Sequence, residues 1–366
     1  NTTPNRFINS RTALQELSEG RILNQGSPVQ ILSCPWCGKQ LSDSRGRPLS
    51  GSYSIDDNSA RTIISCLNPD CEFCRRRSEI GIPAVVVDDE IYRVCPSIII
   101  GTVDKFARLP FKGEIKSIFG RRNRYSPTLG HLSDADTKIR DKVVPDAQPA
   151  DPLLPPELII QDELHLISGP LGSIVGLYES AIDMLTRING IPAKIIASTA
   201  TIRRAKHQVR RLYNSDLSIF PQSGLNSTDS FFAKQRVINE EDDNSSGRMF
   251  LGINAPGSST KTLLVRVYSV LLASAQAEIE ENSEVADPYG TLVGYFNSLK
   301  ALGGAKRLVE DDIKNVRLRY LYNQRGFPRK NITEPDELTS RLKSWQIPAL
   351  LRKLNRKFPR GESDWP

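Results

Sequence analysis

Two short apolar runs, separated by an amphipathic stretch, stand out in the middle of the chain. The runs cover 158–160 and 193–197, and each one ends in polar residues. Between them, apolar residues recur on one face of a predicted helix over 171–188. The positions on that face are Leu171, Val175, Tyr178, Ile182 and Leu185. A strand, a helix and a second strand in this order predict a βαβ unit with two parallel strands.

Polar side chains follow both predicted strands. Gln161, Asp162, Glu163 and His165 come after the first strand, and the second ends in Ser-Thr-Ala-Thr at 198–201. Open α/β sheets bind ligands outside the carboxyl ends of their strands. Two adjacent carboxylates there suit phosphoryl transfer, since one can hold Mg²⁺ through its water shell and the other can polarise an attacking water. The alternative is a solvated turn, which the flanking strands and helix disfavour.

The rest of the chain also alternates between apolar runs and stretches with helical spacing. Further strands are predicted over 96–100, 249–253 and 291–296, with a hairpin over 83–93. Helices are expected over 12–23, 202–213, 261–279 and 347–358, and from residue 299 up to or beyond a break at Gly303 and Gly304. This alternation predicts an α/β fold built on parallel sheets.

Five of the six cysteines lie within 34–74. Thiolates placed in two tight turns can close a tetrahedral Zn²⁺ site, and the metal then supplies folding energy to a small module. The expected ligands are Cys34, Cys37, Cys66 and Cys71, although Cys74 could replace Cys71. Disulfides are disfavoured in a cytosolic protein, and a redox pair would not need the second cluster. We therefore predict one structural zinc site.

Length, charge and hydropathy narrow the class of protein. A chain of 366 residues predicts two or three domains. The formal net charge of +7 fits a nucleic-acid-binding protein, although solvated basic faces are common in other proteins. No apolar run approaches the roughly 20 residues that span a bilayer, and no signal-peptide pattern is present. We expect a soluble cytoplasmic protein with no membrane partner.

The Asp-Glu-Leu-His sequence at 162–165, followed by Ser-Thr-Ala-Thr, resembles motifs II and III of superfamily 2 helicases in their DExH form. The resemblance implies RecA-like lobes with parallel sheets, and a site that binds ATP and Mg²⁺. It makes Asp162, Glu163 and His165 catalytic residues. It also implies that His165 bridges to Ser198 and Thr199, which couples hydrolysis to movement of the lobes.

Three further segments resemble parts of the same helicases. The strand end at Gly101 and Thr102, with Lys105 behind it, is similar to motif Ib, which holds a nucleic-acid phosphate; an ordinary capped helix is the alternative. The run 291–296 resembles motif IV, at the start of the second lobe. The segment 338–341 resembles a later motif that meets the backbone of the tracking strand. The candidate nucleic-acid contacts are Thr102, Lys105 and Arg341.

Taken together, the segments 101–107, 157–172 and 287–297 are similar to the large helicase subunit of the DISARM antiphage defence system. This resemblance implies an ATP-dependent DNA helicase or translocase, whose partners are DNA and a protein with a helicase-associated domain. Zinc-bearing DExH repair helicases are a near alternative. The sequence does not distinguish a DNA substrate from an RNA substrate, and it does not specify the direction of movement or the identity of the partner.

Two helicase elements have no match in this sequence. Thr260 stands where a phosphate-binding loop needs its second glycine, so 257–262 is expected to be a capped helix start. No arginine-rich motif VI is found either. We therefore expect the chain to be part of a longer protein and to be inactive as an isolated ATPase. A zinc-stabilised nucleic-acid-binding scaffold with an inactive RecA fold is the alternative of a different class.

The predicted organisation has four parts. An N-terminal segment, 1–30, precedes the zinc module at 31–77. Residues 78–215 form part of the first RecA-like lobe, with the segments that resemble motifs Ib, II and III. A linker and part of the second lobe occupy 216–366.

Overall fold

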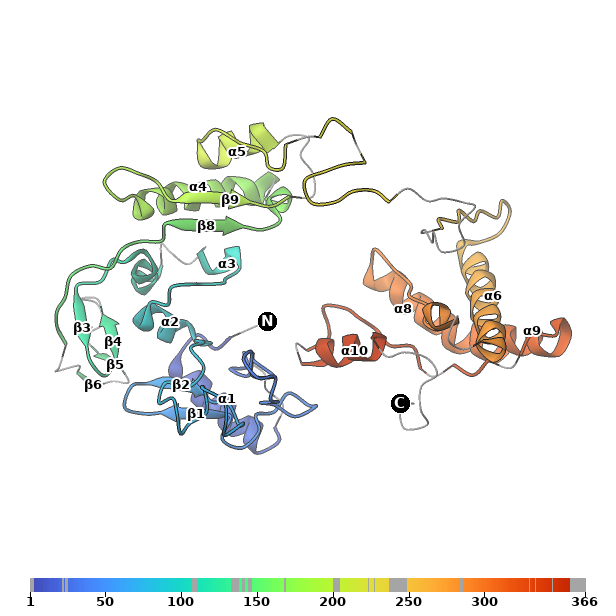
Figure 1. The fold of residues 1–366 in the computed structure, drawn as a ribbon, viewed down its shortest axis with the longest axis horizontal. Coiled ribbons are helices and arrows are strands. Elements are labelled where there is room, and N and C mark those ends of the chain that lie inside the picture. The colour runs from blue at the N-terminus through green and yellow to red at the C-terminus, as the bar shows by residue number, and fades with distance from the viewer. Residues whose placement is uncertain are drawn as a thin grey trace. The chain divides into compact units, whose positions relative to one another are not determined.

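The computed structural model combines helices with small sheets of two or three strands (Figure 1). The residues that it describes are 3–21, 23, 26–106, 111–132, 138–139, 142–143, 147–167, 169–199, 205–222, 224–226, 228–236, 249–282, 286–328, 330–332, 334–343 and 345–355. The chain divides into two compact units, Asn1–Arg236 and Val237–Pro366.

The first helix and the cysteine-rich module share one hydrophobic core. Helix α1, Phe7–Ser18, begins earlier than the predicted 12–23. Strands β1, Tyr53–Asp56, and β2, Arg61–Ile64, form an antiparallel hairpin between the two cysteine pairs. The shared core is made of Leu14, Leu17, Val29, Cys34, Leu41, Tyr53, Ile64, Cys66, Cys71, Ile82, Val86 and Val87. The module is therefore packed against α1 and against the segment that follows it.

Helix α2, Asp88–Val94, occupies the region in which the sequence predicted a hairpin over 83–93. That prediction was wrong because three acidic residues, which were assigned to a turn and a strand, stand in the first turn of a helix. Carboxylates are favourable there, since they face the positive end of the helix dipole. Two of them also bind neighbours, because Asp89 accepts from the backbone N–H of Phe7 at 2.9 Å and Asp88 accepts from Lys105 Nζ at 2.7 Å.

A buried arginine ties α2 to two neighbouring turns. The guanidinium of Arg93 donates to the carbonyl oxygens of Ala60 at 2.7 Å, Leu129 at 2.9 Å and Ser59 at 3.1 Å. Ala60 and Ser59 lie in the turn of the β1–β2 hairpin, and Leu129 lies directly before strand β4, Gly130–Leu132. Three carbonyl partners compensate for the burial of this charged group. Arg93 therefore links the cysteine-rich module to the small sheet that follows it.

That small sheet has the strand order β4-β3-β7. Its strands are β3, Arg124–Ser126, β4, Gly130–Leu132, and β7, Gln148–Pro149, and all of its pairings are antiparallel. The single-turn helix α3, Val103–Phe106, and the 3-10 helix η1, Gly113–Phe119, precede it, and the two-residue strands β5, Lys138–Ile139, and β6, Lys142–Val143, pair separately. At Gly130, φ is +90° and an added Cβ would lie 2.6 Å from the carbonyl oxygen of Arg93, so only glycine fits this approach.

The predicted βαβ unit is present. Strand β8, Leu158–Gln161, runs parallel to β9, Lys194–Ala197, and helix α4, Gly169–Thr186, connects them. Helix α5, Ala205–Tyr213, packs beside α4. Buried side chains of Leu164, Ile167, Val175, Val209 and Leu212 form the core beneath the two helices.

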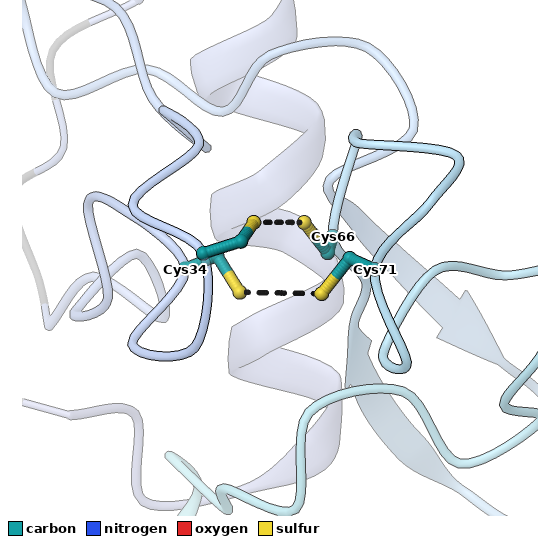
Figure 2. Close-up of side chains that lie close together, drawn as sticks. Cys34, Cys66 and Cys71 are labelled. Carbon is teal, nitrogen blue, oxygen red and sulfur yellow. Dashed lines mark hydrogen bonds between the residues drawn. The ribbon is translucent and has the colours of Figure 1, made fainter.

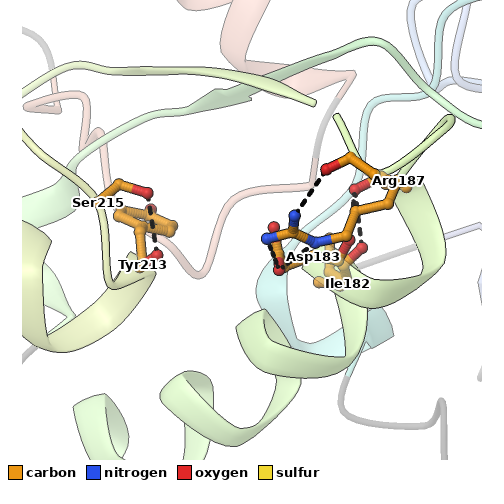
Figure 3. Close-up of polar contacts among 7 residues, drawn as sticks. Ile182, Asp183, Arg187, Tyr213 and Ser215 are labelled. Carbon is orange, nitrogen blue, oxygen red and sulfur yellow. Dashed lines mark hydrogen bonds and ion pairs between the residues drawn. The ribbon is translucent and has the colours of Figure 1, made fainter. Parts of the chain in front are cut away.

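A salt bridge closes the turn between α4 and β9. Arg187 pairs with Asp183 one helical turn earlier, with Nη2 2.7 Å from Oδ2 (Figure 3). Its Nη1 also donates to the carbonyl oxygen of Gly190 at 2.9 Å. These contacts tie the end of α4 to the turn that leads to β9.

The prediction of three other strands was wrong. The segments 96–100, 249–253 and 291–296 have no regular secondary structure, and their large side chains are exposed, as shown by Ile98 at 81%, Ile100 at 94% and Tyr295 at 93%. A strand that is apolar on both faces is stable only between neighbouring strands and helices. Among the described residues, β8 and β9 have no third neighbour. Complete RecA-like lobes therefore remain a prediction.

The second unit is helical over the residues that the structure describes. Its elements are α6, Thr260–Glu281, η3, Asp287–Tyr289, α8, Leu299–Leu308, the π-helix η4, Val309–Arg317, α9, Leu318–Arg325, and α10, Gln346–Leu354. The helix that starts at Leu299 passes through Gly303 and Gly304 without the break that the sequence allowed. The oxygen of Ser259 accepts from the N–H of Thr262 at 3.1 Å, so 257–262 is a capped helix start, as predicted.

Helix α6 is long and apolar enough, by length and composition, to cross a membrane. The sequence analysis found no apolar run of that length. Helices in the core of soluble proteins can share this length and composition, and α6 packs Ala273 against Ile313, Leu318 and Leu321.

Burial of Glu90 predicts a pH-dependent stability. Its side chain is fully buried, Oε1 accepts from the N–H and hydroxyl of Thr62 at 2.9 and 3.0 Å, and burial raises the pKa to about 7. The folded state then holds this proton more tightly than the unfolded state does. Stability should fall as pH rises from 4.5 to about 7, by on the order of 3 kcal/mol.

The uncharged amide of Glu90→Gln should remove most of this dependence, as measured by urea unfolding at about pH 5 and about pH 8. Glu79→Gln, at an exposed position, is the control and should keep the wild-type difference between the two pH values. Equal pH dependence in Glu90→Gln and wild type would contradict this explanation.

Candidate functional site

The register of β8 and β9 brings the polar residues of the two strand ends together. Gln161 pairs with Ala197, so Asp162 and Ser198 follow side by side. The N–H of Ser198 donates to the carbonyl of Gln161, and the N–H of Leu164 donates to the carbonyl of Ser198, each at 2.9 Å. The Ser198 hydroxyl also donates to Oδ1 of Asp162. Three hydrogen bonds therefore join the segments that resemble motifs II and III.

Asp162 is exposed, and its surroundings favour the ionised form of its carboxyl group. Its Oδ1 accepts from Ser198 Oγ and from the backbone N–H of Glu163, the latter at 2.9 Å. These two hydrogen bonds, with that of Ser198 the larger effect, hold the pKa of Asp162 below its ordinary value. An ionised, accessible carboxylate at the end of a strand has the chemistry of a ligand for a hard cation.

Glu163 has a left-handed backbone, with φ 51° and ψ 45°. For a residue other than glycine, this conformation costs on the order of 1–3 kcal/mol, and residues strained in this way cluster at functional sites. The turn η2, Leu164–Leu166, follows directly. The backbone of Glu163 therefore turns the chain sharply between the strand and η2, while its carboxylate stays more than half exposed to solvent.

His165 lies beside Glu163. Its Nδ1 is 3.1 Å from Glu163 Oε2, but the two atoms do not have the geometry of a hydrogen bond, and this nitrogen is buried. The sequence predicted that His165 bridges to Ser198 and Thr199. In the structure, Ser198 forms hydrogen bonds with Gln161, Asp162 and Leu164. Ala200 and Thr201 lie outside the described residues.

Gln208 belongs to this site, and the sequence analysis missed it. Its Nε2 donates to the carbonyl oxygens of Leu164 and Ile167, both at 2.8 Å. A usable signal was present in the sequence, because Gln208 shares the spacing of Ala205, Val209 and Leu212, the buried face of α5. A lone amide on an otherwise apolar face must find partners, and here they are the carbonyls of the turn after Asp162 and Glu163.

The three candidate nucleic-acid contacts lie in different surroundings. Thr102 is exposed, and next to it Val103 packs against the core that contains Leu164. Lys105 is already engaged, because its Nζ lies 2.7 and 3.0 Å from the carboxylate oxygens of Asp88, which is only 6% exposed. Arg341 is exposed in the second unit, whereas the other two belong to the first.

The four predicted zinc ligands come together. The Sγ atoms of Cys34, Cys37, Cys66 and Cys71 all lie within 4.8 Å of one another. Cys34 faces Cys71 at 3.9 Å and Cys37 faces Cys66 at 3.4 Å, across two turns of the chain (Figure 2). Zn–S bonds of about 2.3 Å in a tetrahedron separate the sulfurs by about 3.8 Å. The cluster can therefore hold a metal ion, and its chemistry is that of zinc.

Cys74 lies outside this cluster. Its side chain is buried and its Sγ donates to the carbonyl oxygen of Pro69 at 3.4 Å. Within the cluster, the backbone N–H of Lys39 is the main cause that lowers the pKa of Cys37 to about 7, whereas burial raises that of Cys66 to about 12. The sequence left Cys71 and Cys74 as alternatives, and the geometry selects Cys71.

Comparison with known proteins relates the chain to the DISARM proteins. It is 40% identical over 365 residues to the DISARM protein DrmA of Bacillus paralicheniformis. This alignment covers 95% of the chain and 31% of that relative, so the chain spans about a third of DrmA's length. No protein-family model matches the chain. The chain is DrmA-like, which confirms the resemblance found in the sequence.

Removing a cluster thiol should release the metal. We expect one zinc ion per chain in freshly purified protein, measured by elemental analysis, and a loss of that ion in Cys71→Ser. Chelation should increase hydrogen exchange in 31–77 and also in α1 and 82–87, which share the core of the module.

Cys74→Ser is the matched control, since this buried thiol lies three residues from Cys71 but outside the cluster. It should keep its zinc. Wild-type protein without zinc, or equal zinc loss in the two variants, would contradict the assignment.

Proposed function

We propose that this chain is the part of a DISARM-like DNA helicase or translocase that carries the catalytic strand ends of the first RecA-like lobe. The whole protein would hydrolyse ATP to drive movement on DNA in bacterial antiphage defence, in the cytoplasm. The observation that carries the proposal is the Asp162–Ser198 hydrogen bond between parallel strand ends. The similarity to DrmA supports it.

Each carboxylate would have a different role. Asp162, held in its ionised form by Ser198 and the N–H of Glu163, would bind Mg²⁺ through the water shell of the ion. That ion, bound with ATP, would neutralise developing charge on the phosphates. Glu163 would orient the attacking water and take up its proton. The left-handed backbone of Glu163 fixes where its side chain starts, which is the kind of preorganisation that such a step needs.

The hydrogen bonds between the strand ends suggest how hydrolysis is coupled to movement. Any change at Asp162 reaches the segment after β9 directly, through Ser198. His165, next to Glu163, would join the pathway to Ser198 and Thr199 when a nucleotide and the second lobe complete the site. Coupling of this kind, in which closure of a domain or loop assembles the catalytic groups, is common in enzymes that undergo conformational changes during turnover.

We propose DNA contacts at Thr102 and Arg341. Lys105 is a third candidate, but it must first release its ion pair with Asp88. Lys105 can meet a phosphate only if it gives up Asp88, whose buried carboxylate would then lose its partner. That exchange is costly, since an unpaired buried charge is unfavourable. We also propose that a protein with a helicase-associated domain assembles with the complete molecule. The zinc module would act by holding α1 and the segment before α2 in one core.

The second candidate is a nucleic-acid-binding scaffold with an inactive RecA fold. It is favoured by one observation, the absence of the pattern G-x-x-x-x-G-K-[ST] from the 366 residues. The same observation leads us to expect no ATPase activity from these residues by themselves. ATP hydrolysis by a version that extends to the length of DrmA separates the two candidates.

In that longer version, Glu163→Gln should lower kcat by about 10²–10⁴-fold and keep ATP binding, because the amide retains the shape of the side chain and loses its basicity. Asp162→Asn should instead weaken the binding of Mg²⁺–ATP. The measurements are steady-state phosphate release and equilibrium binding of a fluorescent ATP analogue.

Glu157→Gln is the matched control, because it makes the same change at the opposite end of β8. It should hydrolyse ATP at the wild-type rate. Turnover by Glu163→Gln equal to that of this control would reject the catalytic role, and undetectable hydrolysis by the unmodified longer protein would favour the scaffold.

A further inference from the structure

Helix α5 presents an uncompensated positive face. Lys206, His207, Arg210 and Arg211 are all exposed. Among the ion pairs of the described residues, none involves Lys206, Arg210 or Arg211, and the helix contains no acidic residue. Three cations on little more than two turns of helix repel one another unless an anion lies between them. The face is therefore suited to an anionic partner.

The opposite face of α5 is fixed to the lobe. Ala205, Val209 and Leu212 are buried, and the last two share a core with Leu164 and Ile167. A Cβ added to Gly176 of α4 would come within 4.0 Å of Leu212 Cδ1, which shows how closely the two helices approach. The helix cannot shift without disturbing this core.

Gln208 connects α5 to the turn that follows Glu163. Its amide nitrogen binds the carbonyls of Leu164 and Ile167, at the two ends of the turn that contains His165. The N–H of Leu164 in turn binds the carbonyl of Ser198. A displacement of α5 would therefore reach the backbone between Glu163 and Ser198 through two hydrogen bonds of one side chain.

We propose that the outer face of α5 binds the phosphate backbone of single-stranded DNA, and that Gln208 is the positioning residue that transmits this binding to the turn at 164–167. This inference rests on the proposed function, in which DNA is the substrate. It names a contact site additional to Thr102, Lys105 and Arg341. It also gives DNA a physical connection to the carboxylates at the end of β8.

The chemistry of the face favours a nucleic acid over an acidic protein segment. The exposed residues of α5 are all basic or histidine, and they provide no apolar side chain. Protein interfaces depend on buried aromatic or aliphatic anchors at their centre. Phosphate backbones need only cations and hydrogen-bond donors, and Arg210 and Arg211 offer planar guanidinium groups for this purpose.

The first test measures the affinity of the 366-residue chain for a fluorescent single-stranded DNA oligonucleotide by anisotropy, over a series of salt concentrations. Arg210→Glu with Arg211→Glu should weaken binding at least tenfold. It should also reduce the slope of log affinity against log salt by about 1.4, since each single-strand phosphate contact contributes about 0.7. The milder pair Arg210→Ala with Arg211→Ala should show the same trend without charge reversal.

Arg45→Glu with Lys116→Glu is the matched control, because it makes the same change in net charge at two exposed positions away from α5. It should bind DNA within about twofold of wild type. Equal losses in the control and in the α5 variants would mean that only net charge matters, and would overturn the site. Wild-type affinity in the α5 variants would overturn it as well and would point to an acidic protein partner.

The second test examines the link to the turn. Single-stranded DNA should change hydrogen exchange of residues 161–167 in the wild-type chain. Gln208→Met, which keeps the volume and removes both hydrogen bonds, should still bind DNA but lose most of this change. A melting temperature shows whether the variant is folded. Gln208→Asn, which keeps the amide but shortens the side chain, is a second variant that tests the same two hydrogen bonds. The same exchange response in wild type and both variants would overturn the role of Gln208.

These results can be separated from failure of the proposed function. Neither test requires ATP or hydrolysis. Weakened DNA binding in the α5 variants would support this contact even if the longer protein hydrolysed no ATP. Conversely, a catalytic defect in Glu163→Gln together with wild-type DNA binding in the α5 variants would reject only this inference.

Discussion

Parallel pairing of β8 with β9 is the constraint on which the candidate site depends. Four consecutive residues of each strand are paired in one register, so the chain leaves both strands at the same edge. Asp162 and Ser198 meet there, although they are separated by an 18-residue helix and its flanking turns. A slip of one residue would turn each side chain to the other face of the sheet. Leu164 and Ile167, just after β8, pack into the core under α4 and α5.

A second set of contacts connects the cysteine-rich module to the core beside the βαβ unit. The module and α1 share a core that ends at Val87, and α2 begins at the next residue. Asp88 then binds Lys105 of α3, and Val103 of the same helix packs on the core beneath the site. Zinc binding, which we propose stabilises the module, would thus support the segment that resembles motif Ib as well. Because the ion pair is largely buried, its loss would cost more than a surface pair would.

The features that the sequence predicted correctly are local in origin. The βαβ unit follows from apolar spacing within a few turns, and the cluster of four cysteines follows from two short cysteine patterns. Strands at 96–100, 249–253 and 291–296 were predicted from the same kind of spacing, but a strand forms only when a neighbour pairs with it. The hairpin at 83–93 failed because the acidic residues Asp88 and Asp89 bind Lys105 and the N–H of Phe7, which lie far away in the sequence. Likewise, the left-handed backbone of Glu163 depends on tertiary contacts. The spacing of α5 places Gln208 on its buried face, but the two carbonyls that it binds are set by the tertiary structure.

The central claim is that the end of β8 is a site for Mg²⁺ and nucleotide. It is tested most directly by a cryo-electron microscopy structure of a version extended to the length of DrmA, with Mg²⁺ and a nonhydrolysable ATP analogue. The account predicts density for the cation beside Asp162, joined to it through water, with Glu163 facing the terminal phosphate. Nucleotide bound elsewhere, with Asp162 still held only by Ser198 and the N–H of Glu163, would contradict it.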